Sequence, residues 1–238
     1  MATRFGAPGD TPLVRETAHA KVRALCSLYE SRPPDGLRLT HWGRVRLSEL
    51  KQALRSGRER EPFGILWDVR HWEQDLQVAI VDAQEEYPLA VAYLDMNGLK
   101  EVNNTRSHDD GDLALKAYFN SVASAIGGRG EAYRLGGGAD EVLAVLPGHD
   151  MRTAVSFIRL ACTKLMAEVL WPQDPHPRLS VAAGIVVCTE ETALPARLRS
   201  AAEQAQKRAK EKSRQGAPRP SVISIQGQES LIIIEHEN

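Results

Sequence analysis

The chain has 238 residues, of which 42% are hydrophobic and 26% charged, the balance of an ordinary soluble protein. Its 30 lysines and arginines nearly match its 31 aspartates and glutamates, so the net charge of −1 argues against nucleic acid or a membrane surface as a partner. No apolar stretch reaches the ~18 residues of a membrane span, and the N-terminus has no apolar signal segment.

Residues 1–60 predict an N-terminal helical extension of unknown role. Residues 1–15 are rich in Gly, Pro and Thr, which is typical of a poorly ordered end. Apolar residues recur at helical intervals over 16–31, before Arg-Pro-Pro-Asp-Gly breaks the pattern, and Ser48 is the expected cap of a helix ending near Gly57. Basic residues and a tryptophan would suit a small DNA-binding module, but the neutral overall charge favours a solvated helical arm.

Residues 61–238 predict a second domain of the α+β class. The expected elements are a helix over 63–86, a strand over 89–94, a helix over 109–126, a hairpin of strands 131–135 and 141–146, a helix over 149–170, a strand over 178–188, a helix over 194–214, and strands 221–225 and 231–235. This order predicts a central antiparallel sheet flanked by helices that cover one face. Gly184 indicates a close backbone approach within its strand.

The three cysteines, Cys26, Cys162 and Cys188, are far apart and show no CxxC spacing. This distribution argues against a disulfide framework or a metal knuckle. We therefore expect reduced thiols in a cytoplasmic protein.

Acidic residues occupy the ends of two predicted strands. Asp95 directly follows the apolar run of strand 89–94, and Asp140 and Glu141 lie at the turn of the hairpin. Side chains alternate along a strand, so an acid just past the last apolar residue escapes burial while a rigid element holds it. Two such acids on neighbouring strands could bind one hard cation, and Mg²⁺ prefers one or two carboxylates plus substrate phosphates. The pattern therefore favours nucleotide chemistry, with a turn-capping role for Asp95 as the alternative.

Four segments resemble the GGDEF domain, the nucleotidyl-cyclase palm that makes cyclic di-GMP. LDMNGLKEVNNTRSHDDGD resembles the family's LDxDxFKxxND and GHxxGD segments, RLGGGADEVLAVLP its RxGGDEF hairpin, LSVAAGIVV its fourth core strand and AAEQAQKRAKEKSRQ its closing helix. The order and spacing agree over residues 62–225. The resemblance implies a palm-like (ferredoxin-like) fold, and a homodimeric diguanylate cyclase that condenses two GTP into cyclic di-GMP and releases pyrophosphate.

The resemblance also implies roles for individual residues. It assigns catalysis to Asp95, Asp140 and Glu141. It assigns the binding of Mg²⁺ (or Mn²⁺) to Asp95, Asp140 and the carbonyl of Met96. It assigns the binding of GTP to Asn103, Asp112, Lys100, Gly138, Lys210 and Arg214. A carboxylate and an amide suit the guanine edge, and an i,i+4 Lys and Arg suit a triphosphate. The alternatives are a surface turn residue for Asn103, a first-turn helix acid for Asp112, and an ordinary solvated helix end for Lys210 and Arg214. Asn97 stands where the family usually has Asp, at a position that is not a direct ligand.

The hairpin departs from the family pattern, because Arg134 to Asp140 is two residues longer than the corresponding stretch. Aligned from the acids, it reads Gly138-Ala139-Asp140-Glu141, whereas alignment from Arg134 puts Gly138 at the metal-ligand position. We prefer the first alignment because the acids directly precede the apolar strand.

Two alternatives stay open. One is a catalytically degenerate domain that acts as a nucleotide-binding effector or scaffold. The other is a cyclase resembling the polymerase subunit of type III CRISPR complexes, which makes another cyclic oligonucleotide. The family's inhibitory RxxD is replaced by Arg-Gly-Glu-Ala from Arg129 onward, so product inhibition through that site is not expected.

Overall fold

The computed structural model describes residues 29–32, 36–39, 58–83, 86–136, 140–174 and 178–236. The chain divides into two compact units, Met1–Gly57 and Arg58–Asn238. In the first unit, β1 (Tyr29–Arg32) pairs antiparallel with β2 (Gly36–Leu39). The prediction of helix up to Ser31 is therefore wrong from Tyr29 onward, because these residues form a strand that pairs with Gly36–Leu39. The rest of this predicted helix, and the whole of the helix expected to begin at Ser48, lie outside the described residues.

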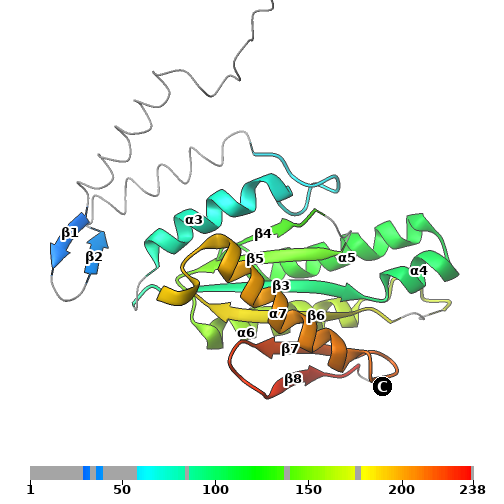
Figure 1. Ribbon diagram of the computed structural model, residues 1–238. Coiled ribbons are helices and arrows are strands. Elements are labelled where there is room, and N and C mark those ends of the chain that lie inside the picture. Colours follow the sequence, from blue (N-terminus) through cyan, green and yellow to red (C-terminus); the bar gives the residue numbers. More distant parts are fainter. Residues whose placement is uncertain are drawn as a thin grey trace, which may run out of the picture. The chain divides into compact units, whose positions relative to one another are not determined.

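The second unit is built on a six-stranded sheet in the order β4-β5-β3-β6-β7-β8 (Figure 1). The strands are β3 (Leu89–Asn97), β4 (Glu131–Arg134), β5 (Glu141–Pro147), β6 (Ser180–Val187), β7 (Ser221–Ile225) and β8 (Leu231–Ile234). Every neighbouring pair is antiparallel except β6 and β7, which are parallel. The predicted antiparallel sheet is thus corrected to a mixed one, because a helix carries the chain back across the sheet between these two strands.

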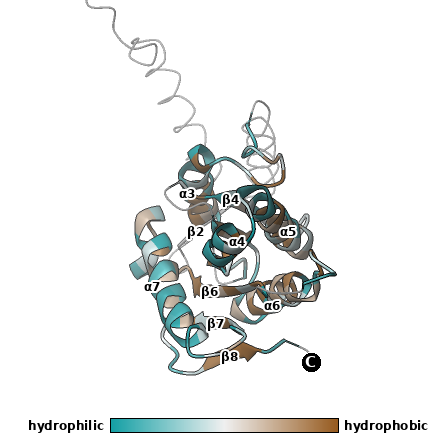
Figure 2. Cartoon of the chain, turned by 90° about the vertical axis from the view of Figure 1, so that its right-hand side faces the viewer, coloured by the Kyte–Doolittle hydropathy of each residue, from teal (hydrophilic) through white to brown (hydrophobic). Residues whose placement is uncertain are grey.

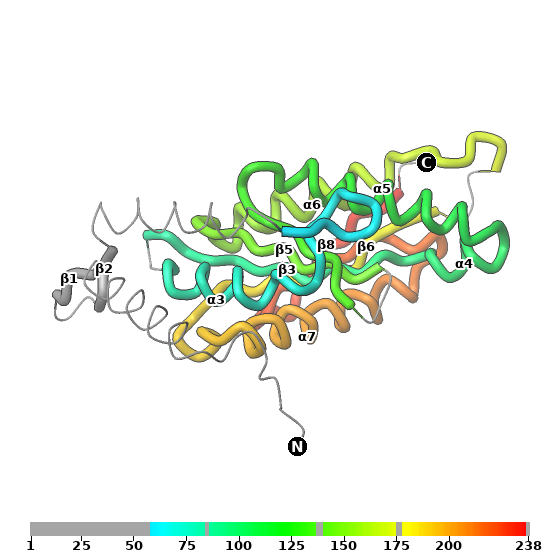
Figure 3. The backbone as a smooth tube through the Cα atoms, turned by 90° about the horizontal axis from the view of Figure 1, so that it is seen from above, coloured from blue at the N-terminus to red at the C-terminus, as the bar shows by residue number. Residues whose placement is uncertain are grey.

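Helices pack on both faces of this sheet. They are α3 (Trp72–Asp82), α4 (Leu99–Thr105), α5 (His108–Ile126), α6 (Met151–Ala167) and α7 (Pro195–Ser213), with short 3₁₀ turns η1 (Val69–His71) and η2 (Glu190–Thr192). Figures 2 and 3 show α7 on one side of the strands and α5 and α6 on the other. The α+β class and the flanking helices are confirmed, but the expectation that one face stays uncovered is wrong.

Alternation along β3 explains the two layers. Ala90, Ala92 and Leu94 join the core formed with α5 and α6, whereas Val91 and Tyr93 join the core formed with α3 and α7. All nine residues of β3 are buried, which fits the predicted apolar central strand. The expectation that Asp95 escapes burial is wrong, because β3 continues to Asn97 and Asp95 is only 6% exposed within it.

Helix α7 lies against β6 at backbone distance. A Cβ added to Gly184 would lie 2.2 Å from the carbonyl oxygen of Ala202 and 2.2 Å from the amide nitrogen of Gln206. The close approach predicted at Gly184 is confirmed. At Gly184 the backbones of β6 and α7 are therefore in direct contact, and this contact helps to fix the position of α7 along the sheet.

The segment Arg58–Asp68, here called the leading segment, runs beside β4. The amide of Trp67 donates to the carbonyl of Ala132 (2.9 Å), and the amide of Arg134 donates to the carbonyl of Trp67 (3.0 Å). The helix predicted over 63–86 is thus wrong before Trp72. Pro62 and a left-handed Gly64 (φ 76°) turn the chain, and buried Glu61 accepts hydrogen bonds from three amides of that turn.

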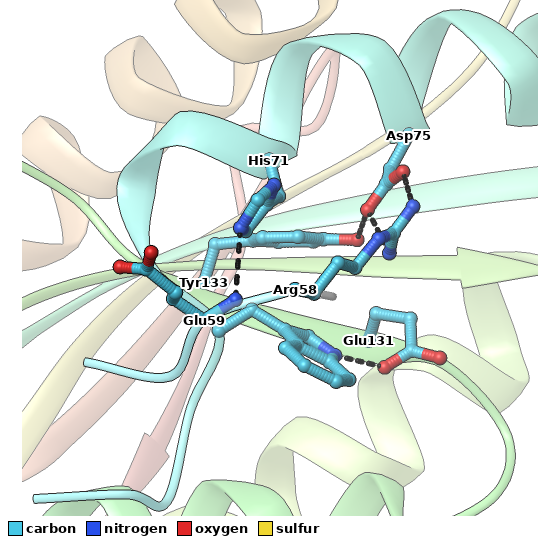
Figure 4. A network of polar contacts seen from close by, with 7 residues as sticks. Arg58, Glu59, His71, Asp75, Glu131 and Tyr133 are labelled. Atoms are coloured by element: carbon cyan, nitrogen blue, oxygen red, sulfur yellow. Dashed lines mark hydrogen bonds and ion pairs between the residues drawn. The ribbon is translucent and has the colours of Figure 1, made fainter. Parts of the chain in front are cut away.

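Side chains fasten the leading segment to the sheet (Figure 4). Both terminal nitrogens of Arg58 contact the carboxylate of Asp75 on α3, which also accepts a hydrogen bond from the hydroxyl of Tyr133 on β4 (2.6 Å). The indole of Trp67 donates to Glu131. Arg58 is therefore part of the sheet domain, and its ion pair with Asp75 links the start of this domain, through Tyr133, to β4, the first strand of the hairpin.

Two of the cysteines lie in the described part of the chain, and both are free thiols. Burial raises the pKa of Cys162 to about 12. Within the described residues, no helix combines the length and the apolar character that crossing a bilayer requires.

Candidate active site

Three predicted acids meet at one end of the sheet. Asp95, near the end of β3, faces α7 because it lies two residues beyond Tyr93 on the same face. It pairs in register with Glu141, the first residue of β5. The preceding residue, Asp140, accepts a backbone hydrogen bond from the amide of Met96 (3.4 Å). Two adjacent strands thus place the acidic residues of the predicted metal site next to one another.

Lys210 joins this acidic end from α7. Its ammonium donates to both carboxylate oxygens of Asp95, at 2.7 and 2.6 Å. The side chain of Asp95 is 8% exposed and that of Lys210 32%. The buried face of α7 carries the small residues Ala202, Ala205 and Ala209, which let the helix approach the sheet. The lysine implied for the triphosphate therefore contacts the first implied metal ligand.

The pKa values of Asp140 and of a nearby tyrosine, Tyr118, are raised at this end of the sheet. Burial and the negative charge of Asp95 raise the pKa of Asp140, and the opposing effect of Lys210 does not cancel them. Burial, followed by the negative charges of Asp95 and Asp140, raises the pKa of Tyr118 well above its usual range. The buried hydroxyl of Tyr118 has no hydrogen-bond partner among the described contacts. The acidic end of the sheet therefore favours the arrival of positive charge.

Two residues beside the acids were not predicted. Burial and then the charge of Glu141 raise the pKa of Tyr93, whose hydroxyl also interacts with Arg199 of α7. The guanidinium of Arg199 lies 5.2 Å from the ring centroid of Trp72. The alternation of β3 was a usable signal for Tyr93, which shares its face with Asp95. No sequence signal identified Arg199, because its position depends on how α7 docks.

The residues implied for the guanine lie on α4 and α5. Oδ1 of Asn103 is buried and has no hydrogen-bond partner in the described contacts. It lies against Gly111, where an added Cβ would be only 1.9 Å away. Asp112 is exposed in the first turns of α5, whose N-cap is Ser107. Helix α4, which the sequence did not predict, starts at Gly98 in the left-handed region (φ 98°).

Asn97 has a structural role. Its amide nitrogen donates to the hydroxyls of Ser180 on β6 (3.0 Å) and Ser213 on α7 (3.1 Å), and it is 4% exposed. Ser213 donates onward to the carbonyl of Pro220 (2.6 Å). This chain of hydrogen bonds joins the end of β3 to the start of β6 and to the end of α7, two residues beyond Asp95.

The remaining predicted residues are not gathered at the acids. Lys100 is exposed on the first turn of α4, and Arg214 is exposed just after α7. No contact within the described part of the structure joins either of them to Asp95 or Asp140. Gly138 lies outside the described residues, so both alignments of the hairpin stay untested.

A divalent cation would find a partial set of ligands here. The described residues contain no cluster of three or more His, Cys, Asp and Glu side chains that could enclose a metal by itself. Asp95, Asp140 and the Met96 carbonyl supply hard oxygen donors, which suits Mg²⁺ sharing its other positions with phosphates and water.

A cavity of about 560 Å³ lies elsewhere, between the end of α6 and β8. Trp171, Leu179 and Ile234 are among its lining residues, and none of the acids is. The candidate site is therefore the open acidic end of the sheet.

Comparison with known proteins identifies a family. The family described as diguanylate cyclase, GGDEF domain, matches residues 62–216. No curated protein matches the sequence significantly.

Solved structures match the fold. The coiled coil and GGDEF domain of DgcB from Caulobacter crescentus, in complex with c-di-GMP, is 18% identical with a TM-score of 0.61, and the match covers 89% of this chain and 98% of that one. The active GGEEF domain of a diguanylate cyclase from Vibrio cholerae is 22% identical with a TM-score of 0.59, covering 69% and 99%. The GGDEF domain of YfiN from Pseudomonas aeruginosa is 25% identical with a TM-score of 0.61, covering 71% and 94%.

The family match spans well over half of the sequence and contains both strands that carry the acids, so the chain belongs to the GGDEF domain family of diguanylate cyclases.

Proposed function

We propose that this protein is a diguanylate cyclase, which condenses two molecules of GTP into cyclic di-GMP and releases pyrophosphate. The observation that carries the proposal is the meeting of Asp95 with Asp140 and Glu141 at one end of the sheet, with Lys210 beside them. In this reaction the ribose 3′-hydroxyl of one GTP attacks the α-phosphate of the other. Mg²⁺ held by Asp95, Asp140 and the Met96 carbonyl supplies Lewis-acid activation when it is bound.

The chain's own residues bind and orient the nucleotide in this proposal. Lys210 and Arg214 neutralise the triphosphate, and Lys100 adds a third cation at the rim. Glu141 adds negative charge beside the metal ligands, and the family resemblance assigns Gly138, which lies outside the described residues, to GTP binding.

The base-binding residues favour guanine. Oδ1 of Asn103 is a buried acceptor without a partner, and Asp112 offers an exposed carboxylate on the neighbouring helix. Guanine presents two adjacent donors, N1–H and the N2 amino group, and two acceptors match them. Adenine lacks this pair of donors, so GTP suits the site better than ATP.

Assembly follows from the reaction. Each chain has one such site and binds one GTP, so the cyclic product requires two chains with their sites face to face. We propose a cytoplasmic homodimer, in which residues 1–57 help to bring two copies together.

The test is a product assay. Purified protein is incubated with Mg²⁺ and GTP, ATP or both, and cyclic nucleotides and pyrophosphate are measured. We expect cyclic di-GMP from GTP alone, its loss in Asp140→Ala, and its retention in Glu229→Ala, an exposed acid in the turn after β7.

Two other outcomes would reject the proposal. Calorimetric binding of GTP with no product at high enzyme concentration would favour a nucleotide-binding scaffold. A product that requires ATP would favour a cyclase of another class.

A further inference from the structure

The contact between Lys210 and Asp95 suggests how metal enters the site. We propose that Lys210 is the counter-ion of Asp95 in the nucleotide-free protein and keeps free divalent cations out, so that metal and nucleotide bind together. This inference rests on the proposed function, because it assumes that Asp95 is a metal ligand.

The geometry places Lys210 in competition with a metal. Its ammonium lies 2.6 and 2.7 Å from the two oxygens of Asp95, the same atoms that a metal would use. Mg²⁺ binds oxygen at about 2.0–2.1 Å, so both cations on one carboxylate would lie within roughly 5 Å of each other. They would repel each other at an end of the sheet where Asp95 is largely shielded from water. The ammonium must therefore move before the metal binds well.

The structure also accounts for the position of Lys210 when no metal is bound. Asp95, Asp140 and Glu141 are three acids close together, and burial and Asp95 already raise the pKa of Asp140. Without a cation, the 8%-exposed Asp95 would be a shielded charge with no partner. Lys210 supplies that partner from a helix whose position the backbone contact at Gly184 helps to fix.

Arrival of a metal–nucleotide complex provides an exchange of partners. The metal takes over Asp95, and the triphosphate gives the ammonium of Lys210 a new anion. Lys210 is 32% exposed and lies at the open end of the site, so its flexible side chain has room to turn. Metal and nucleotide should therefore raise each other's affinity, and by linkage the factor is the same in both directions.

The test measures metal binding rather than turnover. Mn²⁺ is titrated into the full-length protein and followed by the electron paramagnetic resonance of the free ion, with and without 3′-deoxy-GTP, which lacks the attacking hydroxyl. In the wild type, we expect weak Mn²⁺ binding alone and binding at least about tenfold tighter with the nucleotide. In Lys210→Met, Mn²⁺ alone should bind about tenfold tighter than in the wild type, so the coupling should fall by about the same factor, and the part that remains comes from direct ligation of Mn²⁺ by the triphosphate.

A matched control lies one turn earlier on α7. Lys207 pairs with Glu203 (2.8 Å), its side chain is 64% exposed, and Lys207→Met should leave Mn²⁺ binding unchanged. Lys210→Gln is the second variant in case Lys210→Met does not fold, because glutamine can still donate to Asp95 without a charge. Circular dichroism checks that both are folded.

The outcomes separate the inference from the function on which it rests. If a folded Lys210 variant binds Mn²⁺ no tighter than the wild type, Lys210 does not exclude metal and the inference is wrong. If Asp95→Asn leaves Mn²⁺ binding in the presence of 3′-deoxy-GTP unchanged, Asp95 is not a ligand, and both the proposed site and the inference fail.

Discussion

Replacement of Gly111 by alanine tests whether Asn103 is positioned for base binding. A Cβ at this buried helical position would lie 1.9 Å from Oδ1 of Asn103, and 3.0 and 3.4 Å from its Cγ and Nδ2. The nearest atoms thus all belong to one side-chain amide rather than to backbone. The clash can be relieved by turning that amide, so α5 keeps its place while Asn103 loses its position.

The expected magnitudes separate folding from binding. Alanine stabilises a helix interior relative to glycine by roughly 0.5–1 kcal/mol, and forcing Asn103 off its rotamer costs about 0.5–1.5 kcal/mol. These effects nearly cancel, so the free energy of unfolding should change by less than about 1 kcal/mol. A guanine donor left without its acceptor costs about 1–3 kcal/mol, which weakens GTP binding by roughly 5- to 150-fold.

A double-mutant cycle provides the assay. Calorimetry with GTP and urea denaturation are carried out on Gly111→Ala, Asn103→Ala and the double variant. With Asn103 already removed, Gly111→Ala should not weaken GTP binding further, and it should stabilise the protein by about 0.5–1 kcal/mol. Wild-type GTP affinity in Gly111→Ala, or an equal loss in the Asn103→Ala background, would refute the reasoning.

Three other perturbations have defined outcomes. Gly184→Ala should lower the free energy of unfolding by about 1–3 kcal/mol or more, because its Cβ would lie 2.2 Å from the backbone of α7; no loss in urea denaturation would contradict this packing. The raised pKa of Asp140 means that its ionised form destabilises the folded state, so Asp140→Asn should melt at a higher temperature than the wild type at pH 7 without metal. This difference in melting temperature should shrink as the pH falls through the raised pKa towards the pKa of the unfolded chain. A difference that does not depend on pH would argue against this reasoning. A chain that starts at Arg58 should fold and bind GTP but lose cyclase activity. A chain that starts at Glu61 should also melt at a lower temperature, because it lacks the Arg58–Asp75 ion pair. Full activity of the first chain, or equal melting temperatures of the two, would contradict these roles.

Elements with a strong local pattern could be predicted from the sequence. The apolar run from Leu89 to Leu94 gave the central strand, and its end gave the place of Asp95. The parallel pairing of β6 with β7 was missed, although the predicted order of strand, helix and strand over 178–225 is its signal, because a connecting helix returns the chain to run in the same direction. The helix predicted over 63–86 was too long, since a turn that repeats the spacing of a helix leaves Leu66 buried and Phe63 half-buried.

The candidate site was predictable only in part. Asp95, Asp140 and Glu141 follow from strand ends, and the structure brings them together. Lys210 lies in a run of charges like that of any solvated helix end, and its contact with Asp95 depends on the docking of α7. The fit of Gly111 against Asn103 is also a tertiary contact between two helices, which no pattern within either helix encodes.

The strand order of the sheet has a consequence for how the protein folds during synthesis. The centre, β3, is made first; the β4–β5 hairpin then extends one edge, and β6, β7 and β8 extend the other in turn. β3 is buried on both faces in the finished domain, yet Ser180, which begins β6, follows Asn97 by 83 residues. At roughly 5–20 residues per second, one edge of this apolar strand waits about 4–17 s for its neighbour. This interval is when we expect a nascent chain to need a chaperone most, since an open apolar edge invites pairing with other chains.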